Sequence, residues 1–280
     1  GAGDDTINVS NMSDLTSADT ITDTSGTDTL NINGSGTIAS SDFNVSGFEN
    51  LNLSTGADVV TFTDKSSFDT FKSKFSSAVD TKGGDDEFKF SSAITEDLDF
   101  SKINNLEKLS FSENNDIVTF GSDEFNAGIK TLDLGNGQNK AYLNADTTSS
   151  VQVNGGANSD EFVLDFTRIE QGDYKVNGGA GTDTITLSGY QEQTATTTIN
   201  AAFSNMEELN LAGTGAFNID AEVINSWRDT NTSIFKITNS SDNTLNISTN
   251  NSNYKWSNDS GSTWQDSNMK DLGTGSYNIS

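Results

Sequence analysis

Cysteine, histidine and proline are all absent from this chain of 280 residues. Without cysteine there is neither a disulfide framework nor a thiolate metal site. Without histidine there is no Ser-His-Asp triad, no imidazole metal site and no imidazole acid or base. Carboxylates are scattered along the whole chain, so composition singles none of them out as catalytic. These absences remove most enzyme mechanisms, and we expect that the chain is not an enzyme.

Positive charge is scarce as well. The chain has 15 Lys and Arg against 41 Asp and Glu, which gives a formal net charge of −26. Nucleic acids and anionic membranes need a basic surface for binding, so we expect neither as a partner. An acidic chain favours cations instead.

Long apolar runs are also missing, which predicts that nothing inserts into a membrane. Apolar residues make up 32% of the chain, a small supply for a compact core but enough for a thin, elongated one. The chain begins with GAGDD rather than with a Met start or a signal peptide, so we interpret it as a segment of a larger protein.

Short runs that alternate apolar and polar residues recur along the chain. This period of two is typical of a half-buried β-strand. The runs are 5–9, 28–32, 49–53, 58–62, 86–90, 107–111, 116–120, 130–134, 160–164, 183–187 and 207–211. They predict an all-β fold.

The spacing of these runs is regular. Ile7, Leu30 and Leu51 are 23 and 21 residues apart. Similar steps connect Phe88, Leu109 and Leu132, then Val153, Val176 and Ile199, and finally Phe162, Ile185 and Leu209. Repeats of this length cannot bury their own apolar face and therefore stack. The sequence predicts a right-handed parallel β-solenoid, a β-helix or β-roll, with coils of about 21–24 residues.

One passage is duplicated. FENLNLSTGADVVTF (48–62) matches LEKLSFSENNDIVTF (106–120) position for position, and MEELNLAGTGAFNI (206–219) is a looser third copy. This internal duplication supports a repeat architecture.

Two segments break the strand pattern and predict short helices. Residues 65–80 carry Phe68, Phe71, Phe75 and Val79 at helical spacing. Residues 220–228 begin with Asp220 as a helix N-cap and place Val223, Ile224 and Trp227 on one side. We expect both helices to pack on a coil or to cover its end; helices that bind a partner are the alternative.

The predicted solenoid spans residues 1–250. Residues 251–280 are rich in aromatics, with Tyr254, Trp256, Trp264 and Tyr277. A solenoid needs a cap on its last coil, because an open end exposes apolar surface and unpaired strand edges. We interpret the tail as this cap or as the start of an Ig-like β module; a platform that stacks on sugar rings is the alternative.

The segment GGAGTD (178–183) carries the clearest chemical signal. Its glycines permit backbone conformations that turn carbonyl groups inward, and Asp183 adds a carboxylate. Calcium takes about 6–8 oxygen ligands, which two stacked turns of this kind can supply together. The alternative is an ordinary turn in which Asp caps backbone amides.

This turn resembles the nonapeptide G-G-x-G-x-D-x-U-x of the RTX (repeats-in-toxin) proteins, which builds a calcium-filled parallel β-roll. GGAGTDTIT (178–186) matches throughout, GAGDDTIN (1–8) lacks only the first Gly, and GGANSDEFV (155–163) has Asn158 in place of one Gly. Here the full motif occurs once per coil rather than in tandem. The candidate calcium ligands are Asp5, Asp28, Asp58, Asp86, Asp116, Gly155, Asp160, Gly178, Gly179, Gly181 and Asp183. The 23-residue steps from Asp5 to Asp28 and from Asp160 to Asp183 predict that these two pairs stack.

The isolated glycine-Asp turns and the wealth of Thr, Ser and Asn are similar to those of bacterial surface-layer (S-layer) proteins. That resemblance implies type I secretion from a Gram-negative bacterium and calcium-dependent self-assembly into a lattice on the cell surface. Two alternatives stay open. One is a module of a large RTX-type adhesin that binds a carbohydrate such as a cell-surface polysaccharide, and the other is a polysaccharide lyase on a β-helix.

Overall fold

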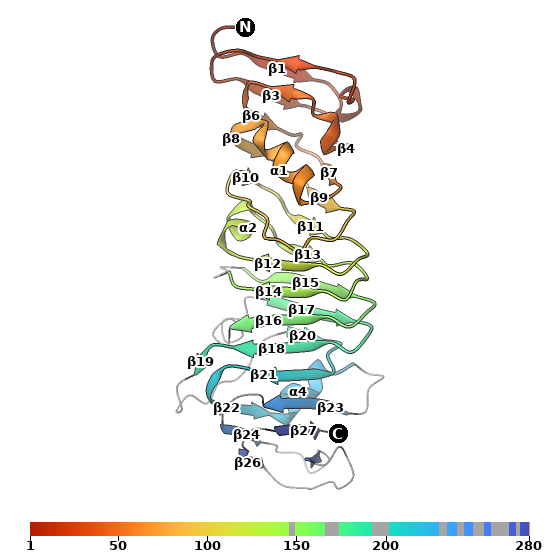
Figure 1. The fold of residues 1–280 in the computed structure, drawn as a ribbon, viewed down its shortest axis with the longest axis vertical. Helices are drawn as coiled ribbons and strands as arrows, with labels where there is room; N and C mark the ends of the chain where they lie inside the picture. Colours follow the sequence, from red (N-terminus) through yellow and green to blue (C-terminus); the bar gives the residue numbers. More distant parts are fainter. Residues whose placement is uncertain are drawn as a thin grey trace. The chain divides into compact units, whose positions relative to one another are not determined.

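The computed structural model describes most of the chain, and β-strands dominate it (Figure 1). The described residues are 1–145, 149–165, 174–191, 202–229, 234–239, 244–248, 255–258, 269–272 and 275–279. The chain divides into two compact units, residues 1–135 and 136–280. Most strand pairs are parallel and helices are few, which confirms the prediction of an all-β parallel fold.

The first unit contains two parallel sheets and a small strand pair. One sheet has the order β1 (Thr6–Val9), β3 (Thr29–Ile32), β6 (Phe48–Asn52), β8 (Phe75–Asp80) and β10 (Ile103–Asn104). The other has the order β4 (Thr37–Ala39), β7 (Val59–Phe62), β9 (Glu87–Phe90), β11 (Lys108–Ser110) and β13 (Thr131–Asp133). The strand β2 (Ile21–Thr22) pairs with β5 (Val45–Ser46), and β12 (Ile117–Phe120) precedes β13 in the chain.

The second unit is parallel as well, until the chain nears its last strands. One series runs β14 (Lys140–Leu143), β16 (Glu161–Asp165), β18 (Thr184–Ser188), β21 (Glu208–Leu211) and β23 (Phe235–Asn239). A second comprises β15 (Val151–Gly156), β17 (Tyr174–Gly179) and β20 (Ala202–Ser204), and a third β19 (Tyr190–Gln191), β22 (Thr214–Asp220) and β24 (Thr244–Ser248). Antiparallel pairing then adds β27 (Gly275–Ile279) to β23, β25 (Trp256–Ser257) to β27, and β26 (Met269–Leu272) to β24.

The pairing confirms most of the predicted spacing. Ile7 pairs with Leu30 and Leu30 with Leu51; the Phe88 and Phe162 series pair as predicted too. One step is wrong. Val176 does pair with Val153, but its other partner is Phe203 rather than Ile199, because the connection after β18 is longer than the earlier ones. Below, residues that strand pairing places side by side are called register neighbours.

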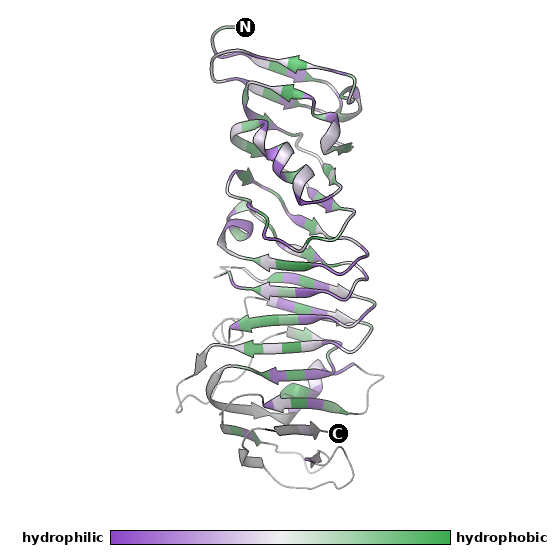
Figure 2. Cartoon of the chain, viewed as in Figure 1, coloured by the Kyte–Doolittle hydropathy of each residue, from purple (hydrophilic) through white to green (hydrophobic). Residues whose placement is uncertain are grey.

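The core follows from the alternation within strands. Leu30, Leu51, Ile185 and Leu209 are fully buried, whereas most of the polar residues between the apolar ones are partly exposed. Figure 2 shows this alternation along the strands of both units. A side-chain period of two sends alternate residues to opposite faces, so each strand supplies only a few apolar groups to the core.

The helices agree with the sequence in part. Residues 65–80 do not form one helix: α1 (Lys65–Ser73) ends early, and Phe75 and Val79 lie in β8. The predicted second helix is present as α4 (Ala221–Trp227), directly after Asp220. The sequence did not predict α2 (Ser122–Ala127) or the 3-10 turns η1 (Met12–Asp14) and η2 (Ser40–Asp42). Among the described residues, none of the helices combines the length and apolarity needed to cross a lipid bilayer.

The aromatic tail is described only in part, so its role as a cap stays a prediction. Trp256 is half-buried in β25, and Tyr277 is nearly buried in β27. Tyr254 and Trp264 lie outside the described residues.

Candidate metal centre

A buried Asp directly precedes six of the strands. Burial is nearly complete, with at most 2% of each residue exposed. The six are Asp28 before β3, Asp58 before β7, Asp86 before β9, Asp116 before β12, Asp160 before β16 and Asp183 before β18. All six were candidate metal ligands from the sequence.

One carboxylate oxygen of each Asp has a defined partner. It accepts a hydrogen bond from a backbone N–H group that lies earlier in the chain, in the segment stacked beside the Asp. The N–H of Asp5 donates to Asp28 Oδ1 at 2.7 Å, and that of Asp160 donates to Asp183 Oδ1 at 2.8 Å. The same bond is made by Gly36 to Asp58, Asp58 to Asp86, Ile94 to Asp116, and Asn139 to Asp160. These bonds link successive layers because buried backbone N–H groups require a partner.

Three glutamates accept the same kind of hydrogen bond, each from the backbone N–H of one of these Asp residues. They extend each series of linked carboxylates, called a row below. The sequence did not predict this role. The N–H of Asp28 donates to Glu49 at 2.7 Å, and the N–H of Asp183 donates to Glu207 at 2.7 Å. Asp86 donates to Glu107 in the same way at 3.2 Å. A signal existed, since each Glu occupies the second position of a duplicated passage, FENLNL, LEKLSF or MEELNL.

The second carboxylate oxygen divides the six Asp into two groups. At Asp58 and Asp116 a serine four residues earlier supplies a hydroxyl, from Ser54 at 2.9 Å and from Ser112 at 3.1 Å. At Asp28, Asp86, Asp160 and Asp183 the Oδ2 atom is buried without a hydrogen-bond partner. A buried carboxylate oxygen without a partner is costly unless the group is protonated or binds a cation.

Burial changes the acidity of several of these groups. It raises the pKa of Asp86 and of Asp160 to about 6, and that of Asp183 to about 7. The pKa of Asp116 is raised for the same reason. Desolvation disfavours the charged form, and neighbouring carboxylates such as Glu207 add to the shift at Asp183.

The glycines of the motif allow close packing between layers. A Cβ on Gly178 would lie 2.2 Å from the carbonyl of Asn205 and 2.5 Å from Asp183 Oδ2. A Cβ on Gly155 would lie 2.3 Å from the carbonyl of Gly178 and 2.5 Å from Asp160 Oδ2. Gly179 and Gly181 have φ of 101° and 145°, which only glycine adopts without strain.

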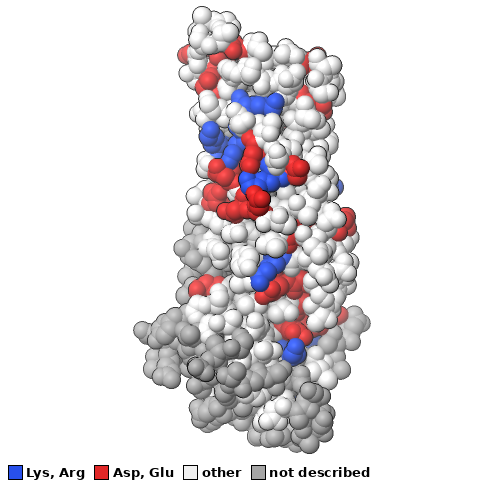
Figure 3. Space-filling model, in the orientation of Figure 1, with Lys and Arg blue, Asp and Glu red and all other residues white. Residues whose placement is uncertain are grey.

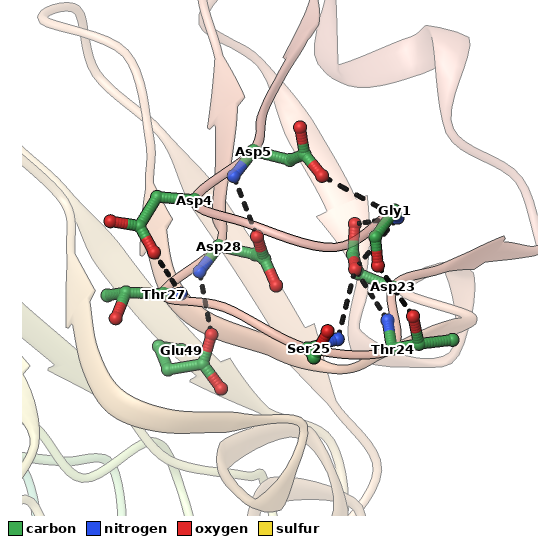
Figure 4. Close-up of polar contacts among 9 residues, drawn as sticks. All are labelled: Gly1, Asp4, Asp5, Asp23, Thr24, Ser25, Thr27, Asp28 and Glu49. Carbon is green, nitrogen blue, oxygen red and sulfur yellow. Dashed lines mark hydrogen bonds and ion pairs between the residues drawn. The ribbon is translucent and has the colours of Figure 1, made fainter.

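One group of three carboxylates lies close enough to share an ion. One oxygen from each of Asp5, Asp23 and Asp28 lies within 4.8 Å of the others. Figure 4 shows the three side chains converging from the segments before β1 and β3. Asp28 is wholly buried and its Oδ2 has no hydrogen-bond partner; we call the three residues the Asp5–Asp23–Asp28 cluster.

These residues fit a hard divalent cation. Calcium binds oxygens at 2.3–2.6 Å, so oxygens up to about 5 Å apart reach the same ion.

The structure therefore brings some of the predicted ligands together and keeps others apart. Asp5 stacks on Asp28 and Asp160 on Asp183, as the spacing predicted, and Asp58 stacks on Asp86 despite the insertion of α1. The Asp116 carboxylate accepts a hydrogen bond from the Ile94 N–H. Asp116 therefore belongs to a different row from Asp86, because the next carboxylate after Asp86 in its row is Glu107. Asp23 was not predicted. Within the described part of the chain, only the Asp5–Asp23–Asp28 cluster gathers three carboxylates at this distance.

Glu124 on α2 is another carboxyl with altered acidity. Burial raises its pKa to about 8, and its Oε2 accepts the Gly121 N–H at 2.7 Å. The adjoining cavity, lined by residues such as Leu109 and Phe120, measures about 10 Å³. A space of this size holds about one water molecule, so Glu124 has no room for a substrate.

Comparison with known proteins finds no protein family, no curated protein and no solved structure that matches the chain.

Proposed function

We propose that this chain is a structural component of a bacterial surface layer, a right-handed parallel β-solenoid that calcium stabilises and that self-assembles on the cell surface after secretion. The parallel strand pairs at steps of 21–24 residues support the solenoid. The surface-layer role is the function that best fits a repetitive, acidic scaffold without histidine or cysteine.

One observation carries the calcium part of the proposal. In the Asp5–Asp23–Asp28 cluster, the buried Asp28 has an Oδ2 without a hydrogen-bond partner, and one oxygen from each of the three carboxylates lies within 4.8 Å of the others. A divalent cation would satisfy that oxygen and relieve the repulsion among the three charges. It would also connect the segments before β1 and β3, so its binding energy would contribute to folding.

Calcium titration with and without the cluster tests the proposal. Adding calcium to chelator-treated protein should raise the melting temperature by about 5–10 °C at roughly a hundredfold excess over Kd. Asp28→Asn keeps an oxygen for the Asp5 N–H but removes the charge, so calorimetry should show at least about tenfold weaker binding at this site. The matched control is Asp97→Asn, which removes the same charge from an exposed side chain.

An unchanged melting curve in excess EDTA would refute calcium stabilisation. Calcium binding that is equally tight in Asp28→Asn and in the parent chain would place the ion elsewhere. Electron microscopy of the calcium-loaded protein tests the surface-layer role, for which ordered arrays are expected.

The adhesin module remains a second candidate because of one groove in the first unit. It measures about 680 Å³ and runs beside α1, and most of its lining residues are Ser or Thr: Ser40, Ser41, Thr61, Thr63, Ser66, Ser67, Thr70 and Ser91. Hydroxyl-lined grooves suit the hydrogen-bonding groups of a carbohydrate. Binding to a glycan array by a chain that stays monomeric in calcium would favour this candidate over the lattice.

A further inference from the structure

The segment 178–186 matches the RTX nonapeptide throughout, and that resemblance implies a calcium ion beside Asp183. Asp183 is wholly buried, and its carboxylate is linked to Asp160 of the preceding turn. An ion shared by the two turns would take its oxygens from these carboxylates and from the backbone carbonyls around them. The contacts of those oxygens show whether the turns fit an ion.

The backbone already holds one oxygen of each carboxylate. Asp183 Oδ1 accepts the Asp160 N–H at 2.8 Å, and Asp160 Oδ1 accepts the Asn139 N–H at 2.7 Å. A buried N–H group needs such an acceptor, so these bonds fix both side chains. In each carboxylate, Oδ2 is the oxygen without a hydrogen bond and therefore the one that an ion would have to reach.

A glycine occupies the space beside Oδ2 in the fully matching turn. A Cβ on Gly178 would lie 2.5 Å from Asp183 Oδ2 and 2.2 Å from the carbonyl oxygen of Asn205. Because a Cα–Cβ bond is about 1.5 Å long, both oxygens lie within about 4 Å of the Gly178 Cα. The hydrogen that Gly178 carries in place of a Cβ therefore points toward two of the oxygens that an ion would have to bridge. Contacts of this Cα–H···O kind are weakly favourable.

The preceding turn repeats this arrangement. A Cβ on Gly155 would lie 2.5 Å from Asp160 Oδ2 and 2.3 Å from the Gly178 carbonyl oxygen. The Gly156 carbonyl is engaged as well, since it accepts the Ala180 N–H at 2.9 Å. These carbonyls thus point at a glycine Cα or at an N–H group of the neighbouring turn, where they do not serve as ligands of an ion.

The surroundings of the two Oδ2 atoms also differ from those of the Asp5–Asp23–Asp28 cluster. Among the described residues, no third carboxylate joins Asp160 and Asp183 in a group whose oxygens lie within 4.8 Å of one another. Both Oδ2 atoms are closed off from solvent, whereas the cluster includes the exposed Asp5 and the half-buried Asp23. Calcium takes about 6–8 oxygen ligands, so the turns lack both the ligands and the opening that the cluster offers.

Two other turns are closed by the protein's own groups in a related way. Asp58 Oδ2 accepts both the backbone N–H and the hydroxyl of Ser54 at 2.9 Å each. Asp116 Oδ2 accepts the Ser112 hydroxyl at 3.1 Å. In these turns a serine occupies the oxygen that a metal would need, as a glycine Cα does beside Asp160 and Asp183.

We infer that the turns at residues 155–160 and 178–183 are metal-free clasps, in which a backbone N–H holds one carboxylate oxygen and a glycine Cα packs on the other. Their RTX-like glycines serve the close packing of successive turns and not the binding of calcium. This inference does not rest on the calcium part of the proposed function, which concerns the Asp5–Asp23–Asp28 cluster in the first unit.

Calorimetric titration of calcium into the full chain at about pH 8 tests the clasps, because a high pH keeps protons from competing with the ion. Asp160→Asn and Asp183→Asn each keep an oxygen for the N–H bond but remove the charge that a cation needs. Both should bind as many calcium ions as the parent chain, with Kd within about twofold. Asp28→Asn is the positive control, since it should lose the ion of the cluster. If either turn variant folds, as its melting curve shows, and binds one ion fewer, the inference is overturned.

Crystals of the parent chain grown in calcium give a second test, which needs no variant to fold. The anomalous difference map should show no calcium peak about 2.3–2.6 Å from Asp160 Oδ2 or Asp183 Oδ2, and a peak there overturns the inference. A peak at the Asp5–Asp23–Asp28 cluster alone supports both the clasps and the proposed function. A chain that binds no calcium at all refutes the calcium part of the proposed function and supports the clasps.

Discussion

At the residue scale, two adjacent glycines have opposite roles. Gly84 has φ of 135°, and a Cβ there would lie 2.6–2.8 Å from the backbone of Gly56 and Ala57. A Cβ on Gly83 would meet nothing within 4 Å. We predict that Gly84→Ala lowers the free energy of unfolding by about 2–4 kcal/mol, because it combines a strained backbone with overpacking. Gly83→Ala should stay within about 0.5 kcal/mol. Urea denaturation measures both, and equal values would contradict the assigned close approach at Gly84.

The sequence predicted the residues of the candidate site better than their roles. It identified each buried Asp at the start of a strand, because a turn residue before an apolar alternation is a local signal. It missed Asp23, since only the folded chain places that side chain beside Asp5 and Asp28. It also left open whether the Asp residues bind metal or cap backbone amides. The capping bonds are present, as at Asp160 and Asp183, whereas metal binding stays a prediction.

At the element scale, α1 shows where sequence patterns become ambiguous. Phe68, Phe71, Phe75 and Val79 fit one helical face, yet the chain leaves the helix after Ser73. Val79 is the register neighbour of Leu51, and a spacing of four also places two residues on the same face of a strand. Parallel pairing with β6 therefore outweighed the local periodicity, and this long-range contact leaves no trace in the segment itself.

The helix α1 packs its buried aromatic side chains against those of neighbouring strands and loops, and this packing leads to a prediction. Phe68 is wholly buried, and its ring centroid lies 5.0 Å from that of Phe100 and 5.4 Å from that of Phe62. We predict that Phe68→Ala destabilises the chain by about 3–5 kcal/mol, through lost burial and the cavity that remains. Thr70→Ala, at an exposed position of the same helix, should change stability by less than about 0.5 kcal/mol. Thermal or urea unfolding measures the difference, and a small effect at Phe68 would argue against its packing under the helix.

At the scale of the whole molecule, charge is the dominant constraint. Figure 3 shows Lys and Arg side chains among acidic ones on one face. The Lys140 Nζ, for example, lies 2.8 Å from a carboxylate oxygen of Glu161. With a net charge of −26, such exposed pairs offset only part of the repulsion. Protons or cations on the buried carboxylates would relieve more of this repulsion, and these two sources depend on pH in opposite ways.

Protonation predicts how stability depends on pH when calcium is removed. Burial raises the pKa of Asp86 and Asp160 to about 6, of Asp183 to about 7 and of Glu124 to about 8. A raised pKa contributes stability that is complete below the unfolded value, near 4, and is lost as the pH rises through the folded value. Groups with a lowered pKa, such as Asp99 beside Lys72, change protonation only below about pH 4 and leave this window unaffected.

In EDTA, the free energy of unfolding should therefore fall by several kcal/mol between pH 5 and pH 8, as measured by urea denaturation. Asp183→Asn keeps an acceptor for the Asp160 N–H but cannot titrate, so it should flatten this dependence, whereas the exposed Asp97→Asn should not. Calcium requires ionised carboxylates, so any calcium that binds at Asp86, Asp160 or Asp183 should stabilise the chain more at pH 8 than at pH 5 and compensate for the lost protons. Stability that rises toward pH 8 in EDTA would show that the buried carboxyls are already charged in the folded chain.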